Sequence, residues 1–129
     1  MVSSFVAELQ TPPEPGPGLP WEQVAAALRY RAGAVMPQAC EFALGSPHAP
    51  RSPPFVAFAG ELFAPNRPVV DAARALMHRV HAEFVYEAAS TDVATDALVA
   101  LRLRRGVCQD FAHVMIATLR SMGLAARYV

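Results

Sequence analysis

Apolar residues recur at helical spacing through the second half of the chain and predict three helices there. The first helix is expected over residues 69–86, where five apolar residues repeat every three or four positions: Ala73, Leu76, Met77, Val80 and Phe84. Leu98 and Leu101 form the stripe of a second helix over 95–104, and a third stripe predicts a helix over 107–122. The final residues, LAARYV at 124–129, indicate the beginning of a β-strand.

Residues with special backbone or capping preferences mark where these helices begin and end. Pro68 suits a first-turn position, and Thr95 is a candidate N-cap of the second helix. Gly106 is expected to adopt the left-handed turn that ends the second helix, and Gly123 to stop the third. The fold class predicted for this chain is therefore mainly α, with three helices after an irregular first half.

The first half is rich in proline, and every proline in the chain lies at or before Pro68. Residues 11–20 and 46–54 are typical of extended, linker-like chain, whereas 21–30 and 55–63 are candidate short helices. This shift in composition predicts a flanking region over 1–68 and a helical unit over 69–129. Eight apolar residues are expected to form the core: Leu76, Val80, Phe84, Leu98, Leu101, Phe111, Met115 and Leu119.

Composition narrows the possible classes of protein. The 129 residues are 53% hydrophobic and 17% charged, which favours a folded globular domain over a disordered chain. The net charge is zero, so no chain-wide basic field attracts nucleic acid or an anionic membrane. The sequence lacks the pattern of a signal peptide and any apolar run of about 20 residues, so a cytoplasmic protein without a membrane segment is expected.

Cys108 is the candidate nucleophile because it lies where the third helix begins. The stretch RRGVCQDFAH, residues 104–113, places the thiol among the unpaired backbone N–H groups of a helix N-terminus. Such a position lowers the pKa of a thiol and supplies donors for an oxyanion. On a helical projection Cys108 shares the apolar face with Phe111, Met115 and Leu119, whereas Asp110, His113 and Arg120 fall on the polar half. The other interpretation is that Cys108 is a small core residue.

The four histidines supply neither an evident general base nor a metal site. His113 lies five residues after Cys108, roughly 140° around the helix and about 7.5 Å along it, too far for one imidazole to reach the thiol. His78 and His81 share a polar helix face but lack a third ligand, so no metal is predicted and no cofactor is implied. His48 lies in a proline-rich loop and carries no signal. Cys40 and Cys108 are expected to be free thiols.

The run TDALVALRLRRGVCQDFAHVMIATLRSMGLAARYV resembles the core of the bacterial transglutaminase-like cysteine enzymes. The matching residues are Gly106, Cys108, Asp110, Phe111, Ala112, Arg120, Gly123 and residues 126–129. The resemblance implies an α+β fold of the papain-like type, with Cys108 as the nucleophile and its own amide as an oxyanion donor. Asp110 and His113 match the motif in structural positions. The catalytic histidine and aspartate of this family follow several dozen residues after the cysteine, so the chain is expected to be an inactive portion of a longer enzyme.

Three functional hypotheses follow. The first is a cysteine-dependent acyl transferase or protease acting on a protein or peptide, in which a thioester forms and water or an amine resolves it. The second is a non-catalytic interaction module, built on the same scaffold. The third is a helix-turn-helix using Arg102, Arg104 and Arg105, which Asp110 and the zero net charge disfavour, so no nucleic-acid partner is expected. An apolar helix face beside an open strand predicts that the chain forms homo-oligomers.

Overall fold

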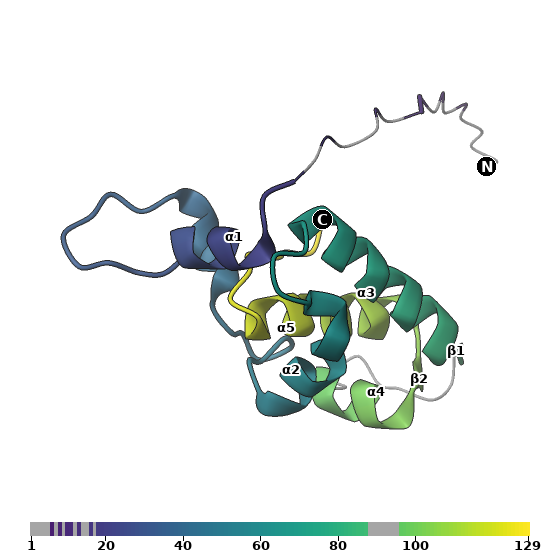
Figure 1. Ribbon diagram of the computed structural model, residues 1–129. Helices are drawn as coiled ribbons and strands as arrows, with labels where there is room; N and C mark the ends of the chain where they lie inside the picture. Colours follow the sequence, from purple (N-terminus) through teal and green to yellow (C-terminus); the bar gives the residue numbers. More distant parts are fainter. Residues whose placement is uncertain are drawn as a thin grey trace.

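The computed structural model describes residues 18–87 and 96–129, together with six positions before residue 18 (6, 8, 10, 11, 13 and 16). In these residues short helices dominate and one small sheet is present (Figure 1). The first half contains α1 (Trp21–Ala27), the 3-10 helix η1 (Gln38–Ala43), α2 (Pro53–Ala59) and the 3-10 helix η2 (Gly60–Phe63). The second half contains α3 (Val69–Glu83), β1 (Val85–Tyr86), α4 (Ala97–Leu103), β2 (Arg105–Gly106) and α5 (Cys108–Ser121).

The three predicted helices are confirmed, with shorter ends. The prediction that α3 continues to residue 86 was wrong, because Phe84 is already extended (φ −108°, ψ 140°) and Val85–Tyr86 pairs in parallel with Arg105–Gly106. Aromatic and β-branched residues favour this extended geometry once a partner strand is available. The candidate cap Thr95 lies outside the described residues, and Asp96 caps α4 by accepting a hydrogen bond from the backbone N–H of Leu98 (3.0 Å).

Two further sequence expectations were wrong. The left-handed residue that ends α4 is Arg104 (φ 54°, ψ 32°), not Gly106. Residues 124–129 form no strand: the Ala126 N–H donates to the carbonyl of Phe42 (3.0 Å), and no other segment among the described residues forms a ladder of hydrogen bonds with them. The first half is also less irregular than predicted, since it holds four short helices.

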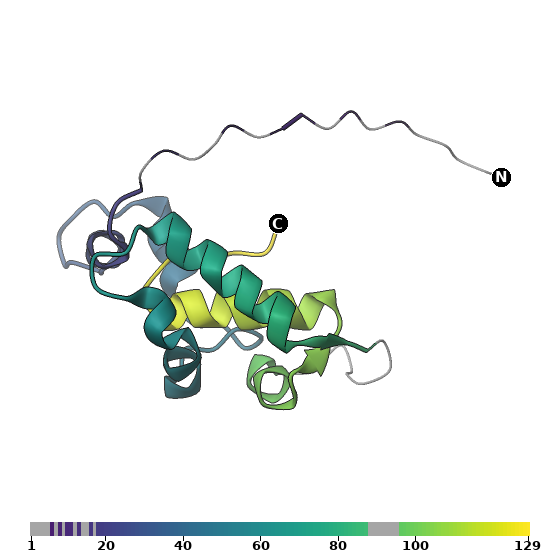
Figure 2. The same ribbon diagram turned by 45° about the vertical axis from the view of Figure 1, so that its right-hand side comes forward.

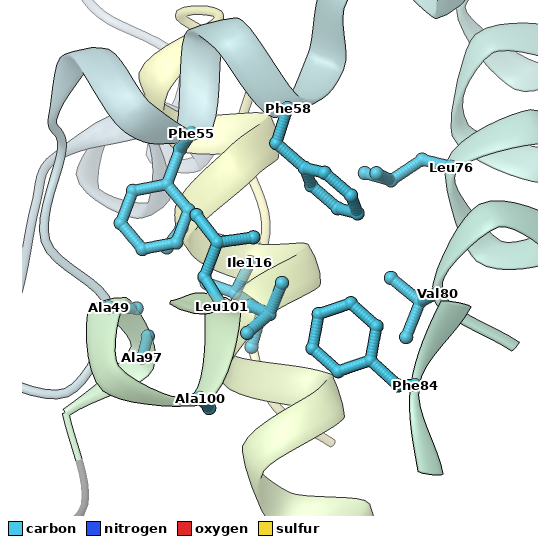
Figure 3. Packing of buried hydrophobic residues seen from close by; sticks show 12 residues of the cluster. Ala49, Phe55, Phe58, Leu76, Val80, Phe84, Ala97, Ala100, Leu101 and Ile116 are labelled. Atoms are coloured by element: carbon cyan, nitrogen blue, oxygen red, sulfur yellow. The ribbon is translucent and has the colours of Figure 1, made fainter. Parts of the chain in front are cut away.

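Helix α5 is the central element. Figure 2 shows α3 crossing one side of α5, with α2 and α4 on the other side. The main core lies between these helices, where Phe55 and Phe58 of α2 meet residues of α3, α4 and α5 (Figure 3). A second cluster joins α1, η2 and α3 through Ala25, Phe63 and Ala72. Residues before position 68 thus contribute to both clusters, and the division of the chain at residue 68 stays a prediction.

Half of the residues expected in the core are buried. Leu76, Val80, Phe84 and Leu101 are buried, whereas four others are only partly buried and pack against that core: Leu98, Phe111, Met115 and Leu119. The most enclosed face of α5 instead carries Val114 and Ala117. The prediction that the thiol-bearing face is the inner one was therefore wrong, because small side chains on the other face admit α2 and α4 closely.

Candidate functional site

The thiol of Cys108 is positioned by the short chain segment that joins α4 to α5. Arg104 turns the chain out of α4, and residues 105–106 then pair with β1 through the Val85 and Glu87 N–H groups, each 2.9 Å from its acceptor carbonyl. Val107 is extended (φ −103°, ψ 174°), and α5 begins at Cys108. Cys108 is a free, exposed cysteine in the first turn of a 14-residue helix.

Asp110 fixes the start of α5. Its carboxylate Oδ2 accepts a hydrogen bond from the Val107 N–H (2.8 Å). Asp110 is the third residue of the helix and Val107 the residue before it, so this bond closes the N-terminal end of α5. Asp110 is only 4% exposed, although it lies on the polar half of the helical projection. Gly106 makes this packing possible, since a Cβ there would lie 2.5 Å from Asp110 Oδ2 and 2.9 Å from its Cβ and Cγ. The structural role expected for Asp110 is confirmed.

Aromatic rings pack against the first turn of α5, the turn that begins with Cys108. Phe111, one turn after Cys108, packs edge-on against Phe84 with ring centroids 5.5 Å apart. The Arg104 guanidinium lies over the rings of Phe58 (4.4 Å) and Phe84 (5.2 Å) and forms an ion pair with Glu83 (3.5 Å). The end of α4 and the start of α5 are thereby held by one contiguous set of contacts.

The histidine closest to Cys108 in sequence faces another part of the molecule. The His113 ring stacks on the His48 ring, with centroids 5.6 Å apart and planes 15° apart, and it also contacts Tyr128 (6.2 Å). Burial lowers the pKa of His113, and the charge of His48 lowers it further, whereas Asp110 raises it. Among the described residues Cys108 has no hydrogen-bond or ion-pair partner, so the expected separation of His113 from the thiol is confirmed.

The His48–His113 contact belongs to a polar cluster that the sequence did not predict. Arg120 is only 9% exposed; its Nε and Nη2 donate to the carbonyl of Ala126 (3.0 and 2.9 Å), and its Nη1 donates to Ser46 Oγ (3.0 Å). Although Arg120 falls on the polar half of the helical projection, its side chain is thus enclosed by its partners. The residues of this cluster are separated by up to 82 positions, from Ser46 to Tyr128, and no sequence signal links them.

The remaining candidate ligands are dispersed. His78 and His81 are exposed on α3, and within residues 18–87 and 96–129 no three histidine, cysteine or acidic side chains are grouped as metal ligands. Two of the arginines that suggested DNA binding have carboxylate partners: Arg104 pairs with Glu83, and Arg105 with Glu87 at 3.3 Å. In the part of the chain that is described, no helix is long and apolar enough to cross a membrane.

This arrangement, an exposed thiol at the first residue of a central helix whose start is held by a buried carboxylate, defines a class of cysteine-containing α+β proteins. Residues 56–129 match the family model of the transglutaminase-like superfamily. This matched segment covers more than half of the chain and includes α3, α4 and α5. The chain belongs to the transglutaminase-like superfamily, as the sequence resemblance implied.

Similar proteins support the same assignment. The chain is 38% identical to uncharacterized proteins of Mycobacterium tuberculosis and Mycobacterium bovis, and the alignments cover all of the chain and 41% of each relative. The crystal structure of a candidate cysteine protease from Cytophaga hutchinsonii matches 70% of this chain and 31% of its own, with a TM-score of 0.63 and 24% identity. That similarity shows the fold, and this chain spans less than half the length of the proteins it matches.

Proposed function

We propose that Cys108 is the nucleophile of a cysteine-dependent acyl-transfer enzyme whose substrate is a protein or peptide. The observation that carries the proposal is the exposed free thiol at the first residue of α5, within the segment that matches the transglutaminase-like model. The first N–H groups of a helix have no partner within the helix, so they are available to a developing oxyanion.

In the proposed reaction the Cys108 sulfur attacks a carboxamide carbon. The C–N bond breaks, the amine leaves with a proton, and a thioester to Cys108 remains. Water then releases a carboxylic acid, or a second amine forms a new amide. Either outcome restores the thiol, and the choice between them depends on groups that approach the thioester.

Turnover of an amide also needs a general base and acid, which typically contribute 10²–10⁴-fold. None of the four histidines forms a hydrogen bond with Cys108: His48 and His113 stack on each other, and His78 and His81 lie exposed on α3. The 129-residue chain is therefore expected to form a thioester with an activated ester but to leave amides intact. A cytoplasmic location belongs to the same proposal.

Acylation by p-nitrophenyl acetate tests the nucleophile directly, because this ester expels its leaving group without a general acid. Peptide mass spectrometry would follow the thioester at Cys108 and at Cys40 separately, in the folded chain and in the chain unfolded by urea at the same pH. Faster acylation of Cys108 in the folded chain is expected, with no ammonia released from a glutamine peptide. Equal or slower acylation in the folded chain would exclude activation by the fold.

A non-catalytic interaction module is the second candidate function, favoured by the exposed apolar side chains of α3 and of residues 124–129. Met77 is 46% exposed and Tyr128 59%. The acylation experiment separates the two functions. If the protein is a non-catalytic module, Cys108 is expected to react no faster in the folded chain than in the unfolded chain. DNA binding is disfavoured because Arg104 and Arg105 already pair with glutamates.

A further inference from the structure

A large cavity in the described part of the chain lies away from Cys108. It measures about 860 Å³ and is enclosed by the end of α1, the chain leading into η1, Arg51, and residues 121–123 after α5. Figure 1 shows α1 at the C-terminal end of α5, the end remote from α4 and β2. Because α5 has 14 residues and rises 1.5 Å per residue, the cavity lies about 20 Å from the thiol along the helix axis. A volume of this size is typical of small-molecule sites.

The inner lining of this cavity is apolar. Ala25 and Ala43 are buried in its wall, and Leu28, Met36 and Met122 are partly buried around them. Leu44, at the rim, is 62% exposed. Methionine and leucine side chains adapt to an aliphatic ligand, and covering them removes apolar surface from water. The lining therefore favours a ligand with an aliphatic body.

Two arginines at the rim add a charge preference. Arg29 follows α1 and Arg51 precedes α2, and within the described residues neither forms an ion pair. Glu41 is the one acidic residue in the lining, so positive charge is in excess. Arginine at an otherwise apolar site recognises carboxylate or phosphate groups through its planar set of donors.

The backbone at Arg51 is held in place by its neighbours. A Cβ on Gly45 would lie 3.2 Å from the Arg51 backbone nitrogen and 3.6 Å from its Cγ, so the two segments are in close contact. The next residue, Ser52, donates its N–H to Ser121 Oγ at the end of α5 (3.2 Å). The loop that carries Arg51 is thus attached to the same helix end that closes the cavity.

We propose that this cavity binds an amphipathic anion, with its aliphatic chain between η1 and the end of α5 and its carboxylate or phosphate between Arg29 and Arg51. The site is separate from Cys108 and does not depend on the proposed catalytic role of that residue. Cys40, partly buried in the cavity lining, provides an internal reporter, because a ligand in the cavity covers its thiol.

The test measures the alkylation rates of both cysteines by iodoacetamide in the 129-residue chain, with decanoate as the probe below its micellar concentration. At a decanoate concentration about ten times its Kd, alkylation of Cys40 is expected to slow roughly tenfold. The rate at Cys108 and the circular dichroism spectrum should not change. Decyltrimethylammonium, with the same alkyl chain and a cationic head, should protect Cys40 far less.

Variants then assign the head-group contacts. Arg29→Gln and Arg51→Gln should each weaken decanoate binding roughly tenfold, the effect of losing a hydrogen bond to a charged group. Arg31→Gln, which removes an exposed arginine outside the lining, should bind as the wild type does, and Arg29→Lys and Arg51→Lys should retain most of the affinity. Absence of protection at Cys40, equal protection by the cationic amphiphile, or unchanged affinity in both glutamine variants would overturn the proposal.

Discussion

At the scale of single residues, Gly106 and Asp110 depend on each other. The carboxylate of Asp110 occupies the space that a side chain at position 106 would need. From there it caps α5 by accepting a hydrogen bond from the Val107 N–H. Any residue larger than glycine at position 106 displaces the cap and shifts the backbone that carries Cys108.

We therefore expect Gly106→Ala to lower the free energy of unfolding by about 1–3 kcal/mol, the usual cost of overpacking. Urea denaturation measures this change. Gly16→Ala is the control, because a Cβ at Gly16 meets nothing within 4 Å. A midpoint for Gly106→Ala equal to that of the control would contradict the close packing of Asp110.

His113 makes the stability of the chain dependent on pH. Burial and the nearby His48 lower the pKa of His113 in the folded chain from its ordinary value of 6.5, so the unfolded chain binds more protons just below that pH. Asp110 acts in the opposite direction, and Tyr128 also contacts the ring. The stability of the folded chain is thus unaffected by His113 protonation above pH 6.5, and it decreases as the pH falls from there towards the pKa of His113 in the folded chain.

Urea denaturation at a series of pH values between about 5 and 8 is expected to show stability decreasing as the pH falls below the ordinary histidine pKa. His113→Asn should reduce this dependence. His81→Asn, which changes an exposed histidine of α3, should leave it as in the wild type. An unchanged pH dependence in His113→Asn would show that other groups control the transition.

At the scale of elements, α5 is packed on most of its circumference, and Arg120, near its C-terminal end, connects it to two loops. The Arg120 side chain joins α5 to Ser46 in the loop before α2 and to Ala126 beyond the helix. The same C-terminal segment is attached to η1 through the Ala126 N–H and the Phe42 carbonyl. Arg120 therefore determines where the chain after α5 lies.

Arg120→Met is expected to destabilise the chain by about 2–3 kcal/mol, because the partly buried Ala126 carbonyl loses a charged donor. Hydrogen exchange at the Ala126 N–H should accelerate at the same time, since the segment is released from η1. Arg102→Met serves as the control: Arg102 is exposed on α4, and its replacement should change stability by no more than about 0.5 kcal/mol. Equal effects of the two substitutions would refute this role for Arg120.

At the scale of the whole molecule, apolar side chains on α3 and at the C-terminal segment remain accessible. A shallow groove of about 460 Å³ is lined by Val69, Val70, Ala73, Arg74, Met77 and Met115. Val129 and Tyr128 are exposed as well, and the backbone of residues 124–129 has few partners in the structure. Such surfaces are typical of protein contacts.

We expect the chain to form dimers through this surface, with residues 124–129 of one copy paired with another copy. Light scattering over a range of concentrations measures the mass. Met77→Glu should weaken association at least about tenfold by burying an unpaired charge, whereas Val99→Glu, on α4 outside the groove, should not. A monomeric mass at the highest concentration would contradict this prediction.

The sequence alone was sufficient for the helices of the second half and for the position of the candidate nucleophile. The spacing of Leu76, Val80 and Leu101 depends on neighbours three or four residues away, and the motif around Cys108 is contiguous. Such a pattern involves only residues of the same helix, so it can be recognised without the rest of the structure. The superfamily assignment rests on the same contiguous residues.

Only the tertiary structure decided which face of α5 is the inner one. An α-helix with apolar or small residues on two faces has no local signal that distinguishes them, and the approach of α2 and α4 selected Val114 and Ala117 over Phe111 and Met115. The burial of Arg120, the stacking of His48 on His113 and the cavity beside Arg51 likewise join residues far apart in the sequence. Their contact energies depend on the packed arrangement of all the helices, so no local pattern of residues encodes them.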